Sequence, residues 1–181
     1  LIKALMYLIE KMGSDLLRKH QRVACISYTN VASDEIASRI DRHPAIYSST
    51  IHSFCWLIIK DFQSYLRKEI PNIENWSEKL KEFGEIGKQK IDYNEFGHRS
   101  IDETHVSLGH NDDLVIFVKL MEYSKFRTLL VTRFPIIFID EYQDTDKLIV
   151  PALKDYFLDT GGGPLIGFFG DHWQKIYGTG C

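Results

Sequence analysis

A single stretch decides the fold of this chain: IIFIDEYQDT, residues 136–145. Its first four residues are apolar and follow Pro135, which is typical of a buried strand in a parallel sheet. Asp140 and Glu141 come directly after that strand, at the edge where open α/β sheets bind their ligands. Two adjacent carboxylates at this edge suit a magnesium ion on nucleotide phosphates and a base for the attacking water. The stretch therefore predicts a nucleotide-hydrolysing domain.

A simpler interpretation of the same residues stays open at this point. Asp140 and Glu141 could begin a solvated loop, with Asp144 or Thr145 capping the helix that follows. A bare Asp-Glu pair does not exclude this interpretation.

Strand and helix patterns alternate on both sides of this stretch. We expect strands at residues 23–28, 45–49, 136–139 and 165–169, and helices at residues 1–11, 30–40, 51–70 and 146–158. Gly13 and Pro71 are expected to end the first and third of these helices. The alternation predicts an α/β fold with a parallel sheet.

The segment after Pro71 has a different character. From residue 72 to about 120 the sequence is more charged and less apolar, and it begins with helical spacing. Residues 88–93 and 100–106, separated by Asn94 to Gly97, predict a β-hairpin. We therefore expect residues 1–70 and 121–181 to form the two parts of one domain, and residues 71–120 to be a small inserted α+β subdomain with that hairpin.

Composition sets limits on the class of protein. A chain of 181 residues favours one domain with a small insertion, and its net charge of −3 means that contacts with nucleic acid must be local. Three scattered cysteines are too few for a zinc site and are expected to be reduced thiols. No apolar stretch is long enough to cross a bilayer, so a cytoplasmic location without membrane contact is expected.

The string DEYQDT, residues 140–145, resembles the Walker B motif of the UvrD/Rep-type superfamily 1 DNA helicases. Residues 27–30 with the helix after them resemble motif Ia of that family, TFTNKAA, with Tyr28 in place of Phe and Val31 in place of Lys. Residues 49–54 resemble motif Ib, T-x-H-S-F. These segments stand in the family's order along the chain.

Residues 170–177 resemble motif III of the family, GDxxQSIY. Trp173 and Lys175 depart from the pattern, and Gly178-Thr179-Gly180 replaces the usual Arg-Gly continuation. These departures affect the end of the motif that faces DNA in the family.

The resemblance implies a RecA-like P-loop NTPase sheet, here the first domain of an ATP-dependent DNA helicase. It implies that Asp140 holds Mg²⁺, that Glu141 orients or deprotonates the attacking water, and that Gln174 contacts the γ-phosphate of ATP. It also implies a set of residues that face single-stranded DNA: Tyr28, Thr29, Asn30, His52, Ser53 and Tyr177. ATP and Mg²⁺ are the expected cofactors, and single-stranded and duplex DNA are the expected partners.

Each DNA-side motif has a structural alternative. Thr29 or Asn30 could simply cap a helix, His52 could be a structural hydrogen-bonder, and Tyr28 and Tyr177 could be core residues. Two functional rivals also remain: the helicase subunit of a helicase-nuclease recombination complex, and a non-hydrolysing nucleic-acid binding module derived from a helicase.

The sequence contains no G-x-x-x-x-G-K-[ST] phosphate loop. The Gly161-Gly162-Gly163 run lacks the Lys and the hydroxyl and is expected to end a helix. We expect the chain to be a fragment that starts just after the Walker A motif and stops just after motif III, without the second RecA-like domain. Alone, the 181 residues are expected to have no ATPase activity.

Overall fold

The structure, a computed structural model, describes residues 1–74, 76–94, 98–145, 147–158 and 162–171. The chain divides into two units, the first made of Leu1–Ile51 and Met121–Cys181, the second of His52–Leu120. The two units meet at residues 51/52 and 120/121. The inserted subdomain of residues 71–120 stays a prediction.

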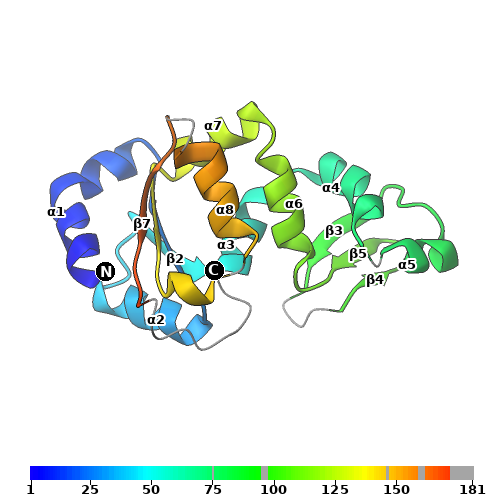
Figure 1. Cartoon of the computed structure of the whole chain (residues 1–181), viewed down its shortest axis with the longest axis horizontal. Helices are drawn as coiled ribbons and strands as arrows, with labels where there is room; N and C mark the ends of the chain where they lie inside the picture. The colour runs from blue at the N-terminus through cyan, green and yellow to red at the C-terminus, as the bar shows by residue number, and fades with distance from the viewer. Residues whose placement is uncertain (75, 95–97, 146, 159–161, 172–181) are drawn as a thin grey trace. The chain divides into compact units, whose positions relative to one another are not determined.

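The first unit is built on a four-stranded sheet in which every strand is parallel to its neighbours. The strands are β1 (Val23–Ser27), β2 (Ile46–Thr50), β6 (Ile136–Ile139) and β7 (Leu165–Phe168), and their order is β2-β1-β6-β7. Figure 1 shows this sheet nearly edge-on between helices. The predicted α/β class and the four predicted strands are confirmed, with ends that differ by a residue or two.

The two central strands are fully buried because their sequences are apolar on both faces. Every residue of β1 and β6 is buried, as expected for parallel strands covered by helices. Helices α1 (Ile2–Arg18) and α2 (Asn30–Arg39) pack on one face, and α7 (Ser124–Arg133) and α8 (Ile149–Leu153) lie on the other (Figure 1). The cluster under α1 and α2 comprises Leu5, Leu16, Val23, Cys25, Ile36, Ile40, Ala45, Ile46, Ile136 and Phe138.

Helix α1 does not end near Gly13, as the sequence predicted, but runs on to Arg18. Gly13 is buried in the middle of the helix, and a Cβ at this position would lie 3.2 Å from Cε1 of His43. The glycine thus allows close packing of the helix on the His43 ring. The glycine that suggests a helix end in the sequence is therefore explained by a tertiary contact.

Helix α8 begins later than the sequence predicted. Residues 142–144 form a short 3-10 turn, η2 (Tyr142–Asp144), and α8 starts only at Ile149. It continues as one π-helical turn, η3 (Lys154–Leu158). A Cβ at Gly163 would lie 2.5 Å from the Phe157 Cβ, so the close approach of the backbone at residue 163 to this turn requires glycine.

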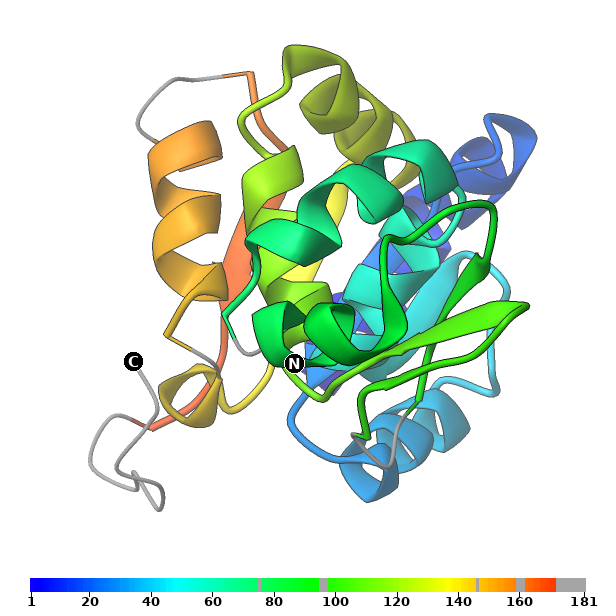
Figure 2. The same ribbon diagram turned by 90° about the vertical axis from the view of Figure 1, so that its right-hand side faces the viewer.

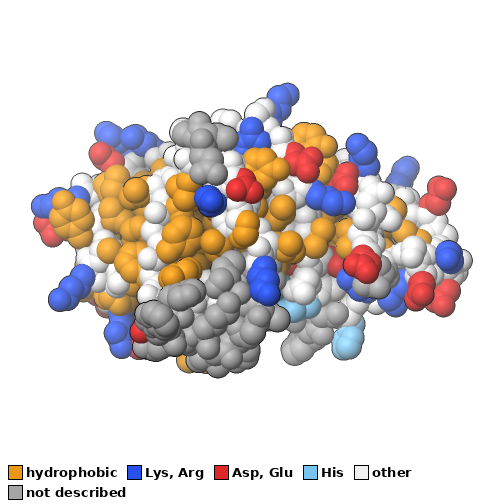
Figure 3. All heavy atoms as spheres, in the orientation of Figure 1, with side chains coloured by type: hydrophobic (Ala, Val, Ile, Leu, Met, Phe, Trp, Pro, Cys, Tyr) orange, Lys and Arg blue, Asp and Glu red, His pale blue; other side chains and the backbone are white. Residues whose placement is uncertain are grey.

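Strand β7 forms one edge of the sheet and is the least buried of the four. The side chains of Leu165 and Phe168 are 61% and 37% exposed, although both are apolar. Figure 3 shows hydrophobic side chains gathered over β7 and the neighbouring α1, where Met6 and Tyr7 are 53% and 61% exposed.

The second unit combines short helices with a three-stranded sheet. The helices are α3 (Ile51–Ile59), α4 (Gln63–Glu69), the 3-10 turn η1 (Ile70–Asn72), α5 (Trp76–Phe83) and α6 (Asp112–Leu120). The single helix predicted for residues 51–70 is therefore two helices. The turn between them is closed by Phe62, whose N–H bonds to the Ile59 carbonyl, and by Gln63, which donates to the Lys60 carbonyl.

The predicted β-hairpin of residues 88–93 and 100–106 is wrong, because the strands that pair across it run in parallel. Strand β3 (Lys90–Tyr93) pairs in parallel with β5 (His105–Leu108), and the short β4 (Ser100–Ile101) pairs antiparallel with β5, giving the order β3-β5-β4. Residues 95–97, the predicted turn, lie outside the described residues. Figure 2 shows this small sheet at the front, with α4 beside β3 and α5 beside β4.

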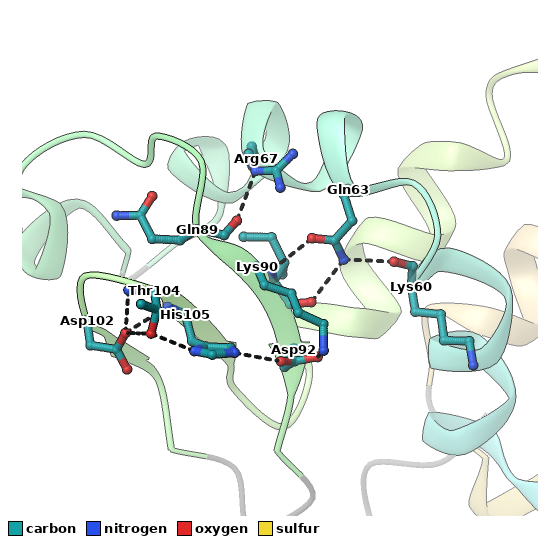
Figure 4. Close-up of polar contacts among 10 residues, drawn as sticks. Lys60, Gln63, Arg67, Gln89, Lys90, Asp92, Asp102, Thr104 and His105 are labelled. Atoms are coloured by element: carbon teal, nitrogen blue, oxygen red, sulfur yellow. Dashed lines mark hydrogen bonds and ion pairs between the residues drawn. The ribbon is translucent and has the colours of Figure 1, made fainter.

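The tight turn of this sheet lies at Asp102, between β4 and β5. One oxygen of the Asp102 carboxylate accepts hydrogen bonds from the backbone N–H groups of Thr104 and His105, each 2.7 Å long (Figure 4). These bonds lower the pKa of Asp102. Such a carboxylate substitutes for backbone partners in a turn, so β4 folds back on β5 and β3 is left to join the far side of β5.

Two buried aspartates at the start of α6 organise the second unit. Asp112 accepts hydrogen bonds from the Trp76 indole at 2.8 Å, the Gly109 N–H at 2.7 Å and both ends of the Arg99 guanidinium. Asp113, which is 0% exposed, lies 3.1 Å from Nδ1 of His52. Burial raises the pKa of Asp113 to about 6, although its bond to His52 opposes that rise.

Asp113 is expected to make the second unit less stable as the pH rises. An acid with a higher pKa in the folded chain than its model value of 3.8 favours folding below about pH 4, and this contribution is lost as the pH passes about 6. A shift of roughly two units corresponds to at most about 3 kcal/mol. Asp113→Asn should remove most of this pH dependence in urea unfolding between pH 4 and 7.

The matched control is Asp92→Asn on β3, where the partly exposed Asp92 pairs with Lys90 at 3.2 Å. This change should leave the pH dependence as it is in the wild type. If the free energy of unfolding depended on pH in the same way in the wild type and in Asp113→Asn, the Asp113 carboxyl would not be the titrating group.

Candidate functional site

The carboxyl ends of the parallel strands bring three of the sequence motifs to one edge of the first unit. Ile26 is level with Ile139, and the Asp140 N–H donates to the Ile26 carbonyl at 2.8 Å. Ser27 in turn is level with Thr50 at the end of β2. The starts of motif Ia, the Walker B motif and motif Ib are therefore aligned, because they lie at the carboxyl ends of adjacent strands in register.

The motif Ia segment forms the turn between β1 and α2. Thr29 caps α2, its hydroxyl accepting from the Ala32 N–H at 3.1 Å, and the buried Ser27 hydroxyl donates to the Thr29 carbonyl at 3.2 Å. Tyr28 and Asn30 are exposed, and Tyr28 keeps 44% of its surface open. The capping alternative is thus correct for Thr29, while Tyr28 is not a core residue.

Asp140 and Glu141 leave β6 side by side but in different surroundings. Asp140 is partly buried, and its pKa is raised by burial first and by the charge of Glu141 second. Glu141 is exposed and adopts the left-handed backbone conformation, with φ of 48°. Non-glycine residues adopt this conformation at a cost and are found often at functional sites. The turn after β6 therefore presents one desolvated and one open carboxylate.

A pocket of about 310 Å³ lies beside these two carboxylates. Its lining comes from the start of α1, from α2 and from the end of β6: Leu1, Ile2, Ala32, Glu35, Ile36, Arg39, Asp140 and Glu141. Arg39 is already paired with Glu35. The first turn of α1 borders the pocket, and the N–H groups at a helix start attract phosphate.

The donor set fits a magnesium ion on nucleotide phosphates. Mg²⁺ usually takes one or two carboxylates, with phosphates and waters as its other ligands. Within the described ranges, no group of three or more His, Cys, Asp or Glu side chains could hold a metal ion, so Asp140 and Glu141 are not part of a larger cluster of this kind there. Burial is the larger cause of the raised pKa of Asp140, and repulsion by Glu141 is the second, which a bound cation would relieve.

His52 and Ser53 belong to the second unit. Ser53 is exposed on the first turn of α3. His52 has a side chain that is 16% exposed, contacts Asp113, and lies against the rings of His110 and Tyr93 at centroid distances of 4.1 and 6.0 Å. The structure thus gives His52 the hydrogen-bonding role that was its alternative interpretation, and it leaves the DNA-binding role of His52 and Ser53 a prediction.

Gln174 and Tyr177 lie outside the described residues, so their roles also stay predictions. Of motif III, the structure describes only Gly170 and Asp171. The Phe169 carbonyl before them accepts a hydrogen bond from the Tyr142 N–H at 3.1 Å. The start of motif III is therefore attached to the turn that carries Glu141.

Sequence reasoning missed Gln143, which lies in the same turn. Its side chain is 1% exposed, and its Nε2 donates to Oε2 of Glu141 at 2.6 Å. The signal was present in the sequence: Gln143 stands two residues after Glu141, within the stretch IIFIDEYQDT. The motif pattern alone predicts no hydrogen-bond partner for the Gln143 side chain.

Comparisons with known proteins agree with this geometry. The chain is 24% identical to Gabija protein GajB of Bacillus cereus (strain HuB5-5) over an alignment 270 positions long, which covers 99% of the chain and 40% of that protein. The chain thus spans 40% of the length of this relative. Among the residues that the structure describes, no helix is long and apolar enough to cross a membrane.

The parallel sheet with ligand-type carboxylates at its carboxyl edge is part of a RecA-like P-loop NTPase fold, helicase-like in its motifs. The sequence profile of one family, described as AAA domain, matches residues 1–179. Since that match covers nearly the entire sequence, the chain belongs to the AAA domain family.

Proposed function

We propose that this chain is part of an ATP-dependent DNA helicase of the UvrD/Rep type, which couples ATP hydrolysis to movement on single-stranded DNA and to duplex unwinding. The observation that carries the proposal is the Asp140 and Glu141 pair beside a pocket of about 310 Å³ that is bordered by the start of α1. This edge also carries the exposed Tyr28. Nucleotide chemistry and a contact for a base are therefore supported on neighbouring strands.

In this proposal the two carboxylates have separate roles. Asp140, partly buried and level with the end of β1, would hold Mg²⁺ on the phosphates, which neutralises the charge that develops in phosphoryl transfer. Glu141, exposed and held by Gln143, would orient the attacking water and accept its proton. Gln174 would contact the γ-phosphate, as its resemblance to the family motif implies.

The DNA-binding residues of the proposal follow the motifs. Tyr28 offers an exposed ring on which a base can stack, and Asn30 stands next to it in the first turn of α2. Thr29 is occupied as the helix cap and would contribute its backbone only. His52, Ser53 and Tyr177 complete the proposed single-strand contacts by resemblance. A cytoplasmic protein that acts in DNA repair, recombination or defence fits these partners.

Two other functions are kept as candidates. A helicase subunit of a helicase-nuclease complex has the same motifs, and a nuclease domain elsewhere in the protein would identify it. A non-hydrolysing nucleic-acid binding module is disfavoured by the desolvated Asp140 and by the bond that holds Glu141, since a pure binder needs neither.

Strand separation by the full-length protein tests the proposal. With Mg²⁺ and ATP, the protein is expected to unwind a duplex that carries a single-stranded tail, and a non-hydrolysable ATP analogue should not support unwinding. ATP hydrolysis without strand separation on tails of either polarity would restrict the function to translocation. If the protein showed neither ATP hydrolysis nor strand separation, the non-hydrolysing nucleic-acid binding module would be the remaining candidate.

A further inference from the structure

The Gln143 side chain is buried, and the described residues bond it at one end. Its Nε2 donates to the Glu141 carboxylate at 2.6 Å, whereas no described residue donates to its Oε1. A buried carbonyl without a partner is unfavourable for stability. An apolar residue of similar size would fill this space without that penalty, which argues that the amide serves the carboxylate that it bonds.

The other end of this amide lies against Gly170, the first residue of motif III. A Cβ on Gly170 would lie 2.1 Å from Oε1 of Gln143 and 3.2 Å from the Tyr142 backbone nitrogen. Gly170 also has φ of 148°, a conformation that side chains other than glycine rarely adopt. The close approach of Gln143 to the end of β7 therefore depends on glycine at this position.

Further contacts attach the same turn to β7. The Tyr142 N–H donates to the Phe169 carbonyl at 3.1 Å, and the Tyr142 ring lies edge-on to Phe168 at 5.9 Å. Glu141 itself is exposed and has a left-handed backbone. Its carboxylate would be free to rotate without a partner, and the Gln143 amide is the side chain that restrains it.

We propose that Gln143 is a positioning residue that holds the Glu141 carboxylate near the end of β7, through its bond to Glu141 and its close contact with Gly170. The proposal rests on the proposed function, because it assigns Gln143 to the orientation of the base for ATP hydrolysis. A misplaced catalytic group can lower a rate by up to about a hundredfold. If Gln143 only filled space in the core, by contrast, its substitution would change stability and leave kcat as it is.

Turnover in the full-length protein separates these two roles. Gln143→Met, which keeps the size and removes the donor, should lower kcat about ten- to a hundredfold and leave the KM for ATP within about twofold. In a Glu141→Gln background, the same change should cost nothing further, because orienting a side chain that cannot accept the proton no longer affects the rate. Gln21→Met is the matched control, since the Gln21 side-chain amide donates to the Thr132 carbonyl in the same unit and not to a carboxylate.

Gly170→Ala tests the same contact from the β7 side. The new methyl group would displace the Gln143 amide, so the loss of kcat should match that of Gln143→Met, and the double variant should be no slower than either. Gly167→Ala perturbs the same strand against Phe138 and not against Gln143. It should lower the melting temperature with little effect on kcat.

A measurement on the 181-residue chain without nucleotide tests the bond itself. The side-chain amide signals of Gln143 in ¹H–¹⁵N NMR spectra should move in Glu141→Ala, and their hydrogen exchange should become at least about tenfold faster. Gln143→Glu, which keeps the shape but replaces the donor, should lower kcat as much as Gln143→Met if the donor matters.

The outcomes distinguish the two levels of the proposal. Unchanged amide signals in Glu141→Ala, or full turnover in Gln143→Met and Gln143→Glu, would overturn the positioning role. Additive losses in the Glu141→Gln background would also overturn it. Undiminished turnover in Glu141→Gln alone would instead overturn the proposed function, whatever Gln143 does.

Discussion

Glu141→Gln in the full-length protein is expected to lower ATP turnover by about a hundredfold or more while ATP and Mg²⁺ still bind, because the amide keeps the shape of the side chain and cannot accept the proton. Glu141 is exposed next to the pocket that Asp140 also lines. Its loss should therefore affect kcat and leave nucleotide affinity nearly unchanged. Single-turnover hydrolysis and equilibrium binding of ATP measure the two quantities separately.

The matched control is Glu35→Gln, a second carboxylate in the lining of the same pocket that is paired with Arg39 on α2. This change should leave kcat within about threefold of the wild type. A loss of only a few-fold in Glu141→Gln would mean that Glu141 shapes the turn and does not act as the base.

Tyr28→Ala is expected to weaken the binding of single-stranded DNA by roughly five- to a hundredfold, since stacking of a base on an aromatic ring contributes about 1–3 kcal/mol. Sequence preference should hardly change, because every base has a π-face. With 44% of its surface exposed, Tyr28 should cost little stability when truncated. Tyr177→Ala is expected to have a similar effect on affinity, because the family resemblance places it on the same DNA strand.

Tyr47→Ala is the control for Tyr28. Tyr47 lies on β2, partly buried, with its ring 5.8 Å from that of Phe134. Its truncation should lower the melting temperature and leave DNA affinity unchanged among the folded molecules. The reverse pattern, a large fall in melting temperature in Tyr28→Ala with unchanged affinity, would assign Tyr28 to the fold.

Local sequence was sufficient for the sheet. The runs of residues 23–27 and 136–139 are apolar on both faces, and only a buried strand covered on both sides accommodates such a run. The same pattern also predicted where the carboxylates lie, because Asp140 directly follows β6 and therefore lies at the carboxyl edge of the sheet. These predictions needed no information about distant residues.

The features that sequence reasoning missed all depend on distant partners. Gly13 looks like a helix stop until His43 is packed on it, and the pairing of β3 with β5 depends on the turn at Asp102. The partners of Gln143 include Gly170, whose proximity arises only because β6 and β7 are neighbours. Spacing along the chain does not carry that information.

Steady-state ATPase rates of the full-length protein, with and without single-stranded DNA, test directly whether Asp140 and Glu141 form the hydrolysis site of a DNA-stimulated ATPase. We expect Mg²⁺-dependent hydrolysis that single-stranded DNA accelerates and that Asp140→Asn abolishes. A wild-type rate no higher than that of Asp140→Asn, at saturating ATP, Mg²⁺ and single-stranded DNA, would show that these carboxylates are not a hydrolysis site.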